Sequence, residues 1–166
     1  MSEALTPVVL NGRWTARLDE PYVVFVIGMR INRPWKVRRW WPVAAAMPRM
    51  LNELARSRDI GYLGGRTWFS RTIVMIQYWR SFEALEGYAK APDHAHLPAW
   101  RAFNRATSAN ADVGVYHETY RIDPGAYENV YVNMPPTLFG AVGTLVEARG
   151  AYASARQRLA PETRDA

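Results

Sequence analysis

Two apolar segments decide the fold of this chain: YVVFVIGMR at residues 22–30 and TIVMIQYW at residues 72–79. Both are nearly continuous runs of β-branched and aromatic residues, a composition that is typical of pleated strands. Apolar residues occupy consecutive positions in each run, so both faces of each strand are expected to carry apolar side chains. Each segment is therefore predicted to be a strand in a sheet that is covered on both faces.

The chain between these strands is predicted to contain a helix and a β-hairpin. Pro34 suits the first turn of a helix, and an apolar stripe continues from about residue 35 to residue 56. Pro42 and Pro48 predict a kink in this helix. The glycines at 61–65 mark a turn before a short strand, which is expected to pair with residues 72–79 through Ser70-Arg71.

The second half of the chain repeats the alternation of helix and strand. Ser81 is predicted to cap a helix over residues 82–90, and a second helical piece is expected over about residues 96–108. Strands are expected over residues 112–121 and 126–133, and a last helix over about residues 151–159. Residues 1–20 show no sustained period and are expected to be irregular.

The predicted order β-α-β-β-α-β is the ferredoxin-like split βαβ pattern, an α+β fold with an antiparallel sheet and helices on one face. The apolar residues on the other face need a cover, which a second sheet in a homodimer would supply. We therefore expect a dimeric α/β barrel. The expected organisation is an arm at 1–20, the ferredoxin-like domain at 21–135 and a C-terminal extension with a helix at 136–166.

Composition narrows the classes of function. The chain has 166 residues, a formal net charge of +6 and no cysteine, so disulfides and thiolate ligands are excluded. The basic residues are scattered and no nucleic-acid motif is legible, so we expect no nucleic-acid partner. No apolar run reaches the length of a membrane span and the N-terminus does not resemble a signal peptide. We expect a cytoplasmic protein without a membrane partner, acting on a small molecule.

Histidines are the candidate chemical groups. The three are His94, His96 at the start of the expected 96–108 helix, and His117 inside the expected 112–121 strand. A neutral imidazole is a good ligand for a metal or haem iron, and a second imidazole can exchange protons with a substrate. Spacing alone also fits a helix-terminal His96 bonded to backbone and a strand His117 paired with Glu118 or with a cross-strand partner. Adjacent strand residues face opposite sides, so Glu118 is expected on the face away from His117.

Residues 79–139 resemble the C-terminal half of the aldoxime dehydratases, which are haem enzymes with the dimeric α/β barrel fold. The matching pieces are the Ser81-Phe82-Glu83 helix start, Ala95 to Trp100, Tyr116-His117-Glu118, and the stretch Tyr127 to Asn133. The chain also resembles short bacterial and fungal proteins that are often labelled monooxygenase-like. The resemblance implies haem b as cofactor, His96 as the residue that binds the cofactor metal, and His117 as the catalytic acid–base residue.

Three functions stay open. The first is a haem lyase like aldoxime dehydratase, acting on a substrate with an N–O or O–O bond. The second is a cofactor-independent monooxygenase-like or cyclase-like enzyme, and the third is a non-catalytic protein that binds haem or a hydrophobic ligand. Aldoxime dehydratases are longer, and their catalytic serine and arginine come from another part of the chain. Arg30, Arg66, Ser70 and Arg71 are the candidates for those two roles by chemistry.

Overall fold

The computed structural model describes residues 8–42, 44–45, 54, 58–91 and 111–159. Its strands are β1 Leu10–Arg17, β2 Tyr22–Ile31, β3 Tyr62–Trp68, β4 Thr72–Trp79, β5 Val113–Ile122, β6 Tyr131–Met134 and β7 Thr144–Glu147. The helices are α2 Phe82–Lys90 and α4 Ala155–Arg158, with 3₁₀ turns at η1 Arg58–Ile60, η2 Leu138–Ala141 and η3 Gly150–Tyr152. The chain forms two compact units, a ferredoxin-like unit of residues 23–120 and a terminal unit of residues 1–22 and 121–166.

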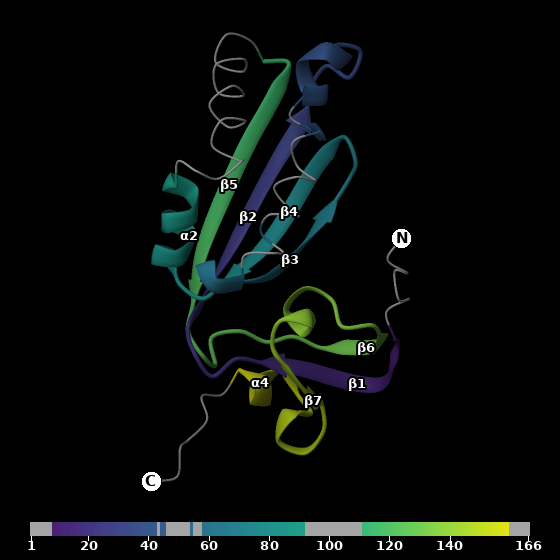
Figure 1. Cartoon of the computed structure of the whole chain (residues 1–166). Helices are drawn as coiled ribbons and strands as arrows, with labels where there is room; N and C mark the ends of the chain where they lie inside the picture. The colour runs from purple at the N-terminus through teal and green to yellow at the C-terminus, as the bar shows by residue number, and fades with distance from the viewer. Residues whose placement is uncertain (1–7, 43, 46–53, 55–57, 92–110, 160–166) are drawn as a thin grey trace. The chain divides into compact units, whose positions relative to one another are not determined.

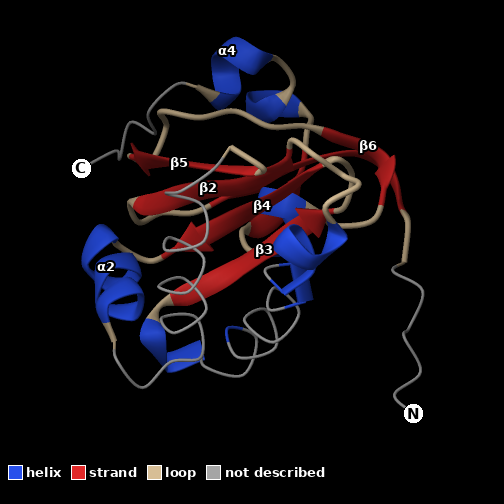
Figure 2. Cartoon of the chain, turned by 90° about the horizontal axis from the view of Figure 1, so that it is seen from above, coloured by secondary structure: helices blue, strands red, loops and turns tan. Residues whose placement is uncertain are grey.

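The ferredoxin-like unit is built on a four-stranded sheet in the order β3-β4-β2-β5 (Figures 1 and 2). The central strands β2 and β4 are antiparallel over eight paired positions, from Val23 opposite Trp79 to Arg30 opposite Thr72. β3 and β4 form the predicted hairpin around residues 70–71. The helical residues 37–42 and 44–45 lie between β2 and β3, and α2 follows β4. This order confirms the predicted α+β, ferredoxin-like fold.

Two hydrophobic clusters define one face of this sheet, here called the helix-facing side. Leu85 and Tyr88 of α2 pack in the first cluster, and Trp40 and Ala44 lie against the second. The strand residues in these clusters are Val23, Phe25, Ile27, Met29, Ile31, Tyr62, Ile73, Met75, Trp79, Val113 and Val115. The intervening residues therefore point to the second face, as strand alternation requires.

Helix α2 begins at the predicted N-cap. The Ser81 side chain accepts a hydrogen bond from the Ala84 backbone N–H at 3.1 Å, and Glu83 lies in the first turn, where the helix dipole favours negative charge. The first helix begins at Val37, two residues later than predicted. The expected helix over residues 96–108 lies outside the described residues.

Asp112, just before β5, forms hydrogen bonds and ion pairs with residues 32–36, which follow β2. Its carboxylate accepts from Arg33 Nη1 at 2.9 Å and from Lys36 Nζ at 3.1 Å, and its carbonyl accepts from the backbone N–H groups of Asn32 and Arg33. The Asp112 side chain is only 2% exposed. Burial raises the pKa of Asp112, but the hydrogen bonds and charges of Lys36 and Arg33 outweigh it and hold this pKa below its usual value.

The terminal unit corrects the expectation that residues 1–20 are irregular. Residues 10–17 form β1, the central strand of a sheet in the order β6-β1-β7. The sequence pattern of β1 is weak because Asn11, Gly12 and Arg13 are polar or flexible, and a register shift falls there. Its partners lie more than 100 residues away in the chain, so tertiary pairing overrides the local pattern.

The strand and the helix that were expected near the C-terminus also differ from the prediction. The strand expected over 126–133 begins only at Tyr131, and the helix expected over 151–159 is divided into the η3 turn and the short helix α4. The side chain of Ser154 caps α4 through the Gln157 N–H. Within the described residues, no helix is long and apolar enough to cross a membrane.

Alternate residues of the stretch Tyr127 to Asn133 anchor the terminal unit. Tyr127 Oη exchanges hydrogen bonds with the backbone of Leu18, and the Asn129 amide does the same with Ala16. Tyr131 Oη accepts from Gly140 N at 2.8 Å, and Asn133 Oδ1 accepts from Gly12 N at 2.9 Å. The rings of Tyr22, Tyr127 and Phe139 pack together with centroids 4.8 to 5.4 Å apart. These side chains continue the pairing of β1 where the strand ladder ends.

The Asp112 contacts predict a pH-dependent loss of stability in Asp112→Asn. Because the folded pKa is lowered, the stabilisation is present above the unfolded pKa, about 3.9, and is lost as the pH falls through the folded pKa. The variant should therefore have a lower urea midpoint than the parent at pH 7, and the difference should close below about pH 4. Denaturation followed by circular dichroism at several pH values measures this.

The matched control is Asp123→Asn, which removes an exposed carboxylate. It should leave the midpoint unchanged at every pH. An Asp112→Asn midpoint equal to that of the parent at pH 7 would mean that the ion pairs with Lys36 and Arg33 do not stabilise the fold.

Candidate functional site

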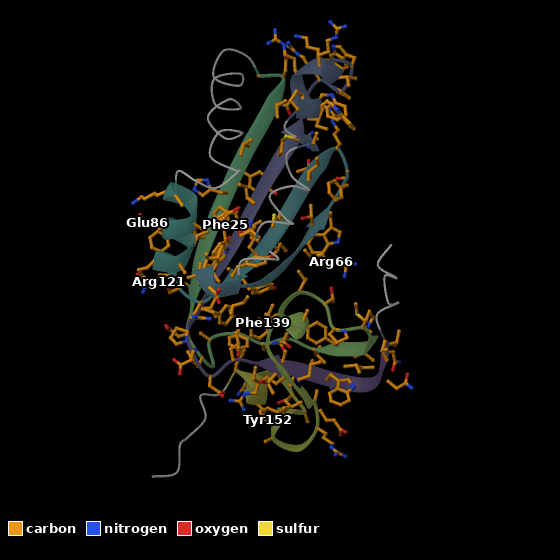
Figure 3. All side chains as sticks on the ribbon, viewed as in Figure 1. Phe25, Arg66, Glu86, Arg121, Phe139 and Tyr152 are labelled. Atoms are coloured by element: carbon orange, nitrogen blue, oxygen red, sulfur yellow. The ribbon has the colours of Figure 1, made fainter. Side chains whose placement is uncertain are left out.

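His117 lies on the helix-facing side of the sheet, near the middle of β5. Its imidazole centroid is 5.8 Å from the centroid of the Phe25 ring, and Phe25 packs against the cluster under α2. The neighbouring Tyr116 lies on the second face, because its ring occupies the space that a side chain at Gly28 would need. Phe25 is visible over the middle of the sheet in Figure 3. The strand alternation thus separates His117 from Tyr116 as expected.

The His117 side chain is available for chemistry. The residue is exposed, and among the described residues its imidazole has a ring contact with Phe25 but no hydrogen bond or ion pair. Because the side chain is exposed, its ring nitrogens can bind water or a substrate. Glu118, its carboxylate neighbour, is engaged on the second face, where it accepts from Tyr120 Oη at 2.5 Å. This hydrogen bond raises the pKa of Tyr120.

One row of residues crosses the helix-facing side at the level of His117. Gly65 of β3 pairs with Gln77 of β4, Gln77 pairs with Phe25 of β2, and Phe25 contacts His117 of β5. Gln77 is a polar side chain in this apolar row and is only 3% exposed. Its Oε1 accepts from Trp79 Nε1 at 2.8 Å, and its Nε2 donates to the sulfur of Met75 at 3.2 Å. The indole therefore fixes which way the carboxamide points.

Two further polar groups lie near Gln77. Tyr62 packs edge-on against Trp79, and burial raises the pKa of its hydroxyl, which stays protonated at neutral pH. Thr67 pairs with Met75, and its Oγ1 is buried without a hydrogen-bond partner among the described residues. Neither position stands out in the sequence. The signal that was available is the single glutamine inside the apolar run TIVMIQYW.

The four candidates for a catalytic serine and arginine do not join this row. Arg30 donates to Thr72 Oγ1, and the guanidinium of Arg66 lies over the ring of Trp68. Figure 3 labels Arg66 beside β3. Ser70 bonds the Thr72 carbonyl inside the hairpin turn, and Arg71 bonds the carbonyls of Ile31 and Asn32. All four residues therefore lie at the β3–β4 hairpin turn or on the second face of the sheet, away from the side that carries His117.

His94 and His96 lie outside the described residues, so the structure does not place the predicted metal ligand beside His117. Within the described part of the chain, no group of three or more histidine, aspartate or glutamate side chains is arranged to hold a metal ion. The described part of the site thus contains the exposed imidazole of His117 and several aromatic rings. It also contains three polar side chains, those of Gln77, Tyr62 and Thr67, which are partly or fully buried.

Sequence comparison identifies the family. The pattern of the monooxygenase af470-like family matches residues 22–139, which include the whole four-stranded sheet. The chain belongs to this family. It is 27% identical over 153 residues to monooxygenase af470 of Aspergillus fumigatus, a match that covers 80% of this chain and 54% of that protein. The chain therefore spans about half the length of the curated relative that it matches.

The fold is similar to that of two solved aldoxime dehydratase structures. One, OxdRE in complex with butyraldoxime, superposes with a TM-score of 0.67 at 16% identity, covering 84% of this chain and 42% of the other. A second aldoxime dehydratase gives a TM-score of 0.65 at 19% identity, with coverages of 81% and 40%. At these identities the similarity establishes the fold, and function has to be argued from the site.

The contacts of His117 predict that it contributes little to folding. His117→Ala should change the free energy of unfolding by less than about 0.5 kcal/mol, as for an exposed side chain. Trp79→Ala, in the same unit and with a side chain 0% exposed, should cost about 3–5 kcal/mol through the cavity that it leaves. Urea denaturation of both variants measures this. A large loss of stability in His117→Ala would assign the histidine to the fold.

Proposed function

We propose that this protein is an enzyme that transforms a small organic molecule on the helix-facing side of the sheet, with His117 as the acid–base residue. The observation that carries the proposal is the His117 imidazole, which lies beside Phe25 and makes no hydrogen bond to the described residues. At least one ring nitrogen of an acid–base histidine must be able to reach the substrate, and both nitrogens of His117 meet this condition. Membership of a monooxygenase-like family supports an enzyme.

For the cofactor we propose haem b, held by His96. The described residues suit the surroundings of such a group, because Phe25, Ile27 and Val115 give the side next to His117 an apolar, partly buried surface. The chain has no cysteine, so a histidine is the ligand that its composition favours. When bound, a histidine-ligated haem would supply an iron centre able to activate an N–O or O–O bond. The fold similarity to aldoxime dehydratases also supports this choice.

The role of His117 in aldoxime-type dehydration follows from proton balance. An aldoxime becomes a nitrile when the N–O bond breaks and the carbon-bound hydrogen leaves as a proton, with water as the second product. His117 would give a proton to the departing oxygen and take one back from the carbon, so that it ends in its starting state. Phe25 would help to orient the imidazole, and the apolar residues on the same side of the sheet would contact the rest of the substrate.

A second candidate is cofactor-independent monooxygenase-like chemistry with His117 as the base, which the family assignment favours. A third is a protein that binds haem or another hydrophobic ligand without turnover. Spectroscopy separates these candidates, since only haem binding gives a Soret band. Nitrile formation from an aldoxime under reducing conditions then distinguishes an enzyme of the first kind from a binding protein.

The haem assignment predicts the behaviour of three variants titrated with haemin. The parent should develop a histidine-ligated spectrum, His96→Ala should abolish it, and His94→Ala should retain it. His117→Ala should bind haemin as the parent does and lose about two to four orders of magnitude in turnover. Absorption spectroscopy and a nitrile assay measure these results. If His96→Ala and His94→Ala both bind haemin as the parent does, the ligand is another residue.

We also propose that a second copy of the chain covers the second face of the sheet. This face carries Trp68, Tyr116 and Tyr120, which are 41%, 39% and 48% exposed. Val24, Val26, Val74 and Ile76 lie between them and are partly exposed as well. An apolar patch of this kind is rare on a monomer.

Light scattering tests the homodimer. The parent should have twice the mass of the 18.9 kDa chain, and Trp68→Asp should shift it to the mass of one chain, because a buried carboxylate is costly. Phe69→Asp is the control, since Phe69 is 64% exposed but follows the end of β3 in the hairpin turn. A parent that is monomeric at micromolar concentration would contradict the proposal.

A further inference from the structure

Three polar side chains gather on the helix-facing side of β3 and β4, at the opposite edge of the sheet from His117. Tyr62 Oη and the Cα of Gln77 lie within 2.8 and 3.2 Å of the point that a Cβ on Gly65 would occupy. The Tyr62 hydroxyl and the backbone of Gln77 therefore both lie next to the bare backbone of Gly65. Thr67 is the next residue of β3 on the same side and is diagonal to Gln77 across the strand pair.

The hydrogen-bonding capacity of this group is not used up by the described residues. Gln77 Oε1 is committed to the Trp79 indole, but its Nε2 carries two hydrogens and donates only to the Met75 sulfur, a weak acceptor. Thr67 Oγ1 is buried and has no partner within the described part of the chain. Leaving such groups unsatisfied costs stability, so a fold that retains two of them on the same face of the β3–β4 pair calls for an explanation.

The chemistry of the group defines what it would bind. Its free functions are N–H and O–H donors, and the surrounding side chains are the aromatic rings of Trp79, Tyr62 and Phe25. No lysine or arginine occupies a helix-facing position of β3 or β4, because Arg66 pairs with Ile76 and points to the second face. A carboxylate or phosphate would lack a counter-charge here. The arrangement suits a neutral oxygen acceptor on an apolar molecule.

We propose that Tyr62, Gln77 and Thr67 form a subsite that binds a neutral carbonyl oxygen of a flat, apolar molecule, remote from its reacting group. The row from Gly65 through Gln77 and Phe25 to His117 links the subsite to the acid–base residue. The molecule is thus fixed by its oxygen at the β3–β4 edge and presents another part to β5. This deepens the proposed function and rests on it only for the identity of the reacting end. Binding at the subsite depends on neither haem nor His117.

The test uses acetophenone, which has a carbonyl acceptor, and toluene, which has none, as probes of the intact protein. Titration followed by ¹H–¹⁵N NMR should show the side-chain amide of Gln77, assigned by its absence in Gln77→Leu, moving with acetophenone. Gln77→Leu and Thr67→Val should each bind acetophenone about fivefold to tenfold more weakly, the usual worth of one hydrogen bond. Toluene should bind the parent weakly and be indifferent to both substitutions.

Thr67→Val keeps the test decisive, because it should raise the melting temperature while it weakens binding. It removes a buried hydroxyl that lacks a partner and preserves the shape of the side chain. Thr72→Val is the control, since Thr72 pairs with Arg30 at a second-face position and should affect neither binding nor the Gln77 resonance. A Thr67→Val variant with lower stability and unchanged binding would show that a water molecule satisfies the hydroxyl, and the subsite would be rejected.

The test of the subsite can succeed or fail independently of the test of the acid–base role of His117. If acetophenone binds equally to the parent, Gln77→Leu and Thr67→Val, or if toluene binds as tightly as acetophenone, the subsite is wrong even where His117 proves catalytic. If binding depends on both residues and His117→Ala leaves turnover unchanged, the subsite holds and the acid–base role falls.

Discussion

The antiparallel pairing of β2 with β4 is the constraint on which the ferredoxin-like unit depends. It fixes, over eight consecutive pairs, which side chains face the helices and which face the other way. Because side chains alternate along a strand, a slip of one residue would exchange the two faces completely. The register therefore places Phe25, Gln77 and Trp79 together on the helix-facing side. It also leaves Val24, Ile76 and Tyr78 for the second face.

The sequence was sufficient for elements whose signal is local. β2, β4 and α2 were predictable because apolar runs and a serine cap act within a few residues. β1 was not, since its stabilisation comes from partners at the far end of the chain and its own residues are polar. His117 could be placed on the correct face by alternation and residue type alone. Thr67 could not be found, because a threonine in a strand is ordinary until its surroundings are known.

The stretch Tyr127 to Asn133 illustrates a different limit. It contributed to the resemblance with aldoxime dehydratases, and its tyrosines and asparagines are residue types that often carry chemistry. In the structure its alternate side chains form hydrogen bonds with backbone groups of Leu18, Ala16, Gly12 and Gly140. Part of the similarity therefore reflects how the terminal unit is assembled. This is why the case for a reaction has to rest on His117 and its surroundings, where hydrogen-bonding capacity is left over.

The same anchors bear on how freely the N-terminal strand can change. Tyr127, Asn129 and Asn133 hold β1 and the residue after it through main-chain N–H and C=O groups, which every residue type except proline offers alike. The strand is thus selected mainly for its extended shape and for a glycine at position 12, where φ is +88°. Its exposed side chains are consequently less constrained than the buried Thr15 and Ala16. A strand held in this way resembles the inserted strand of donor-strand complexes, in which main-chain hydrogen bonds supply the affinity and a few side-chain positions supply the specificity.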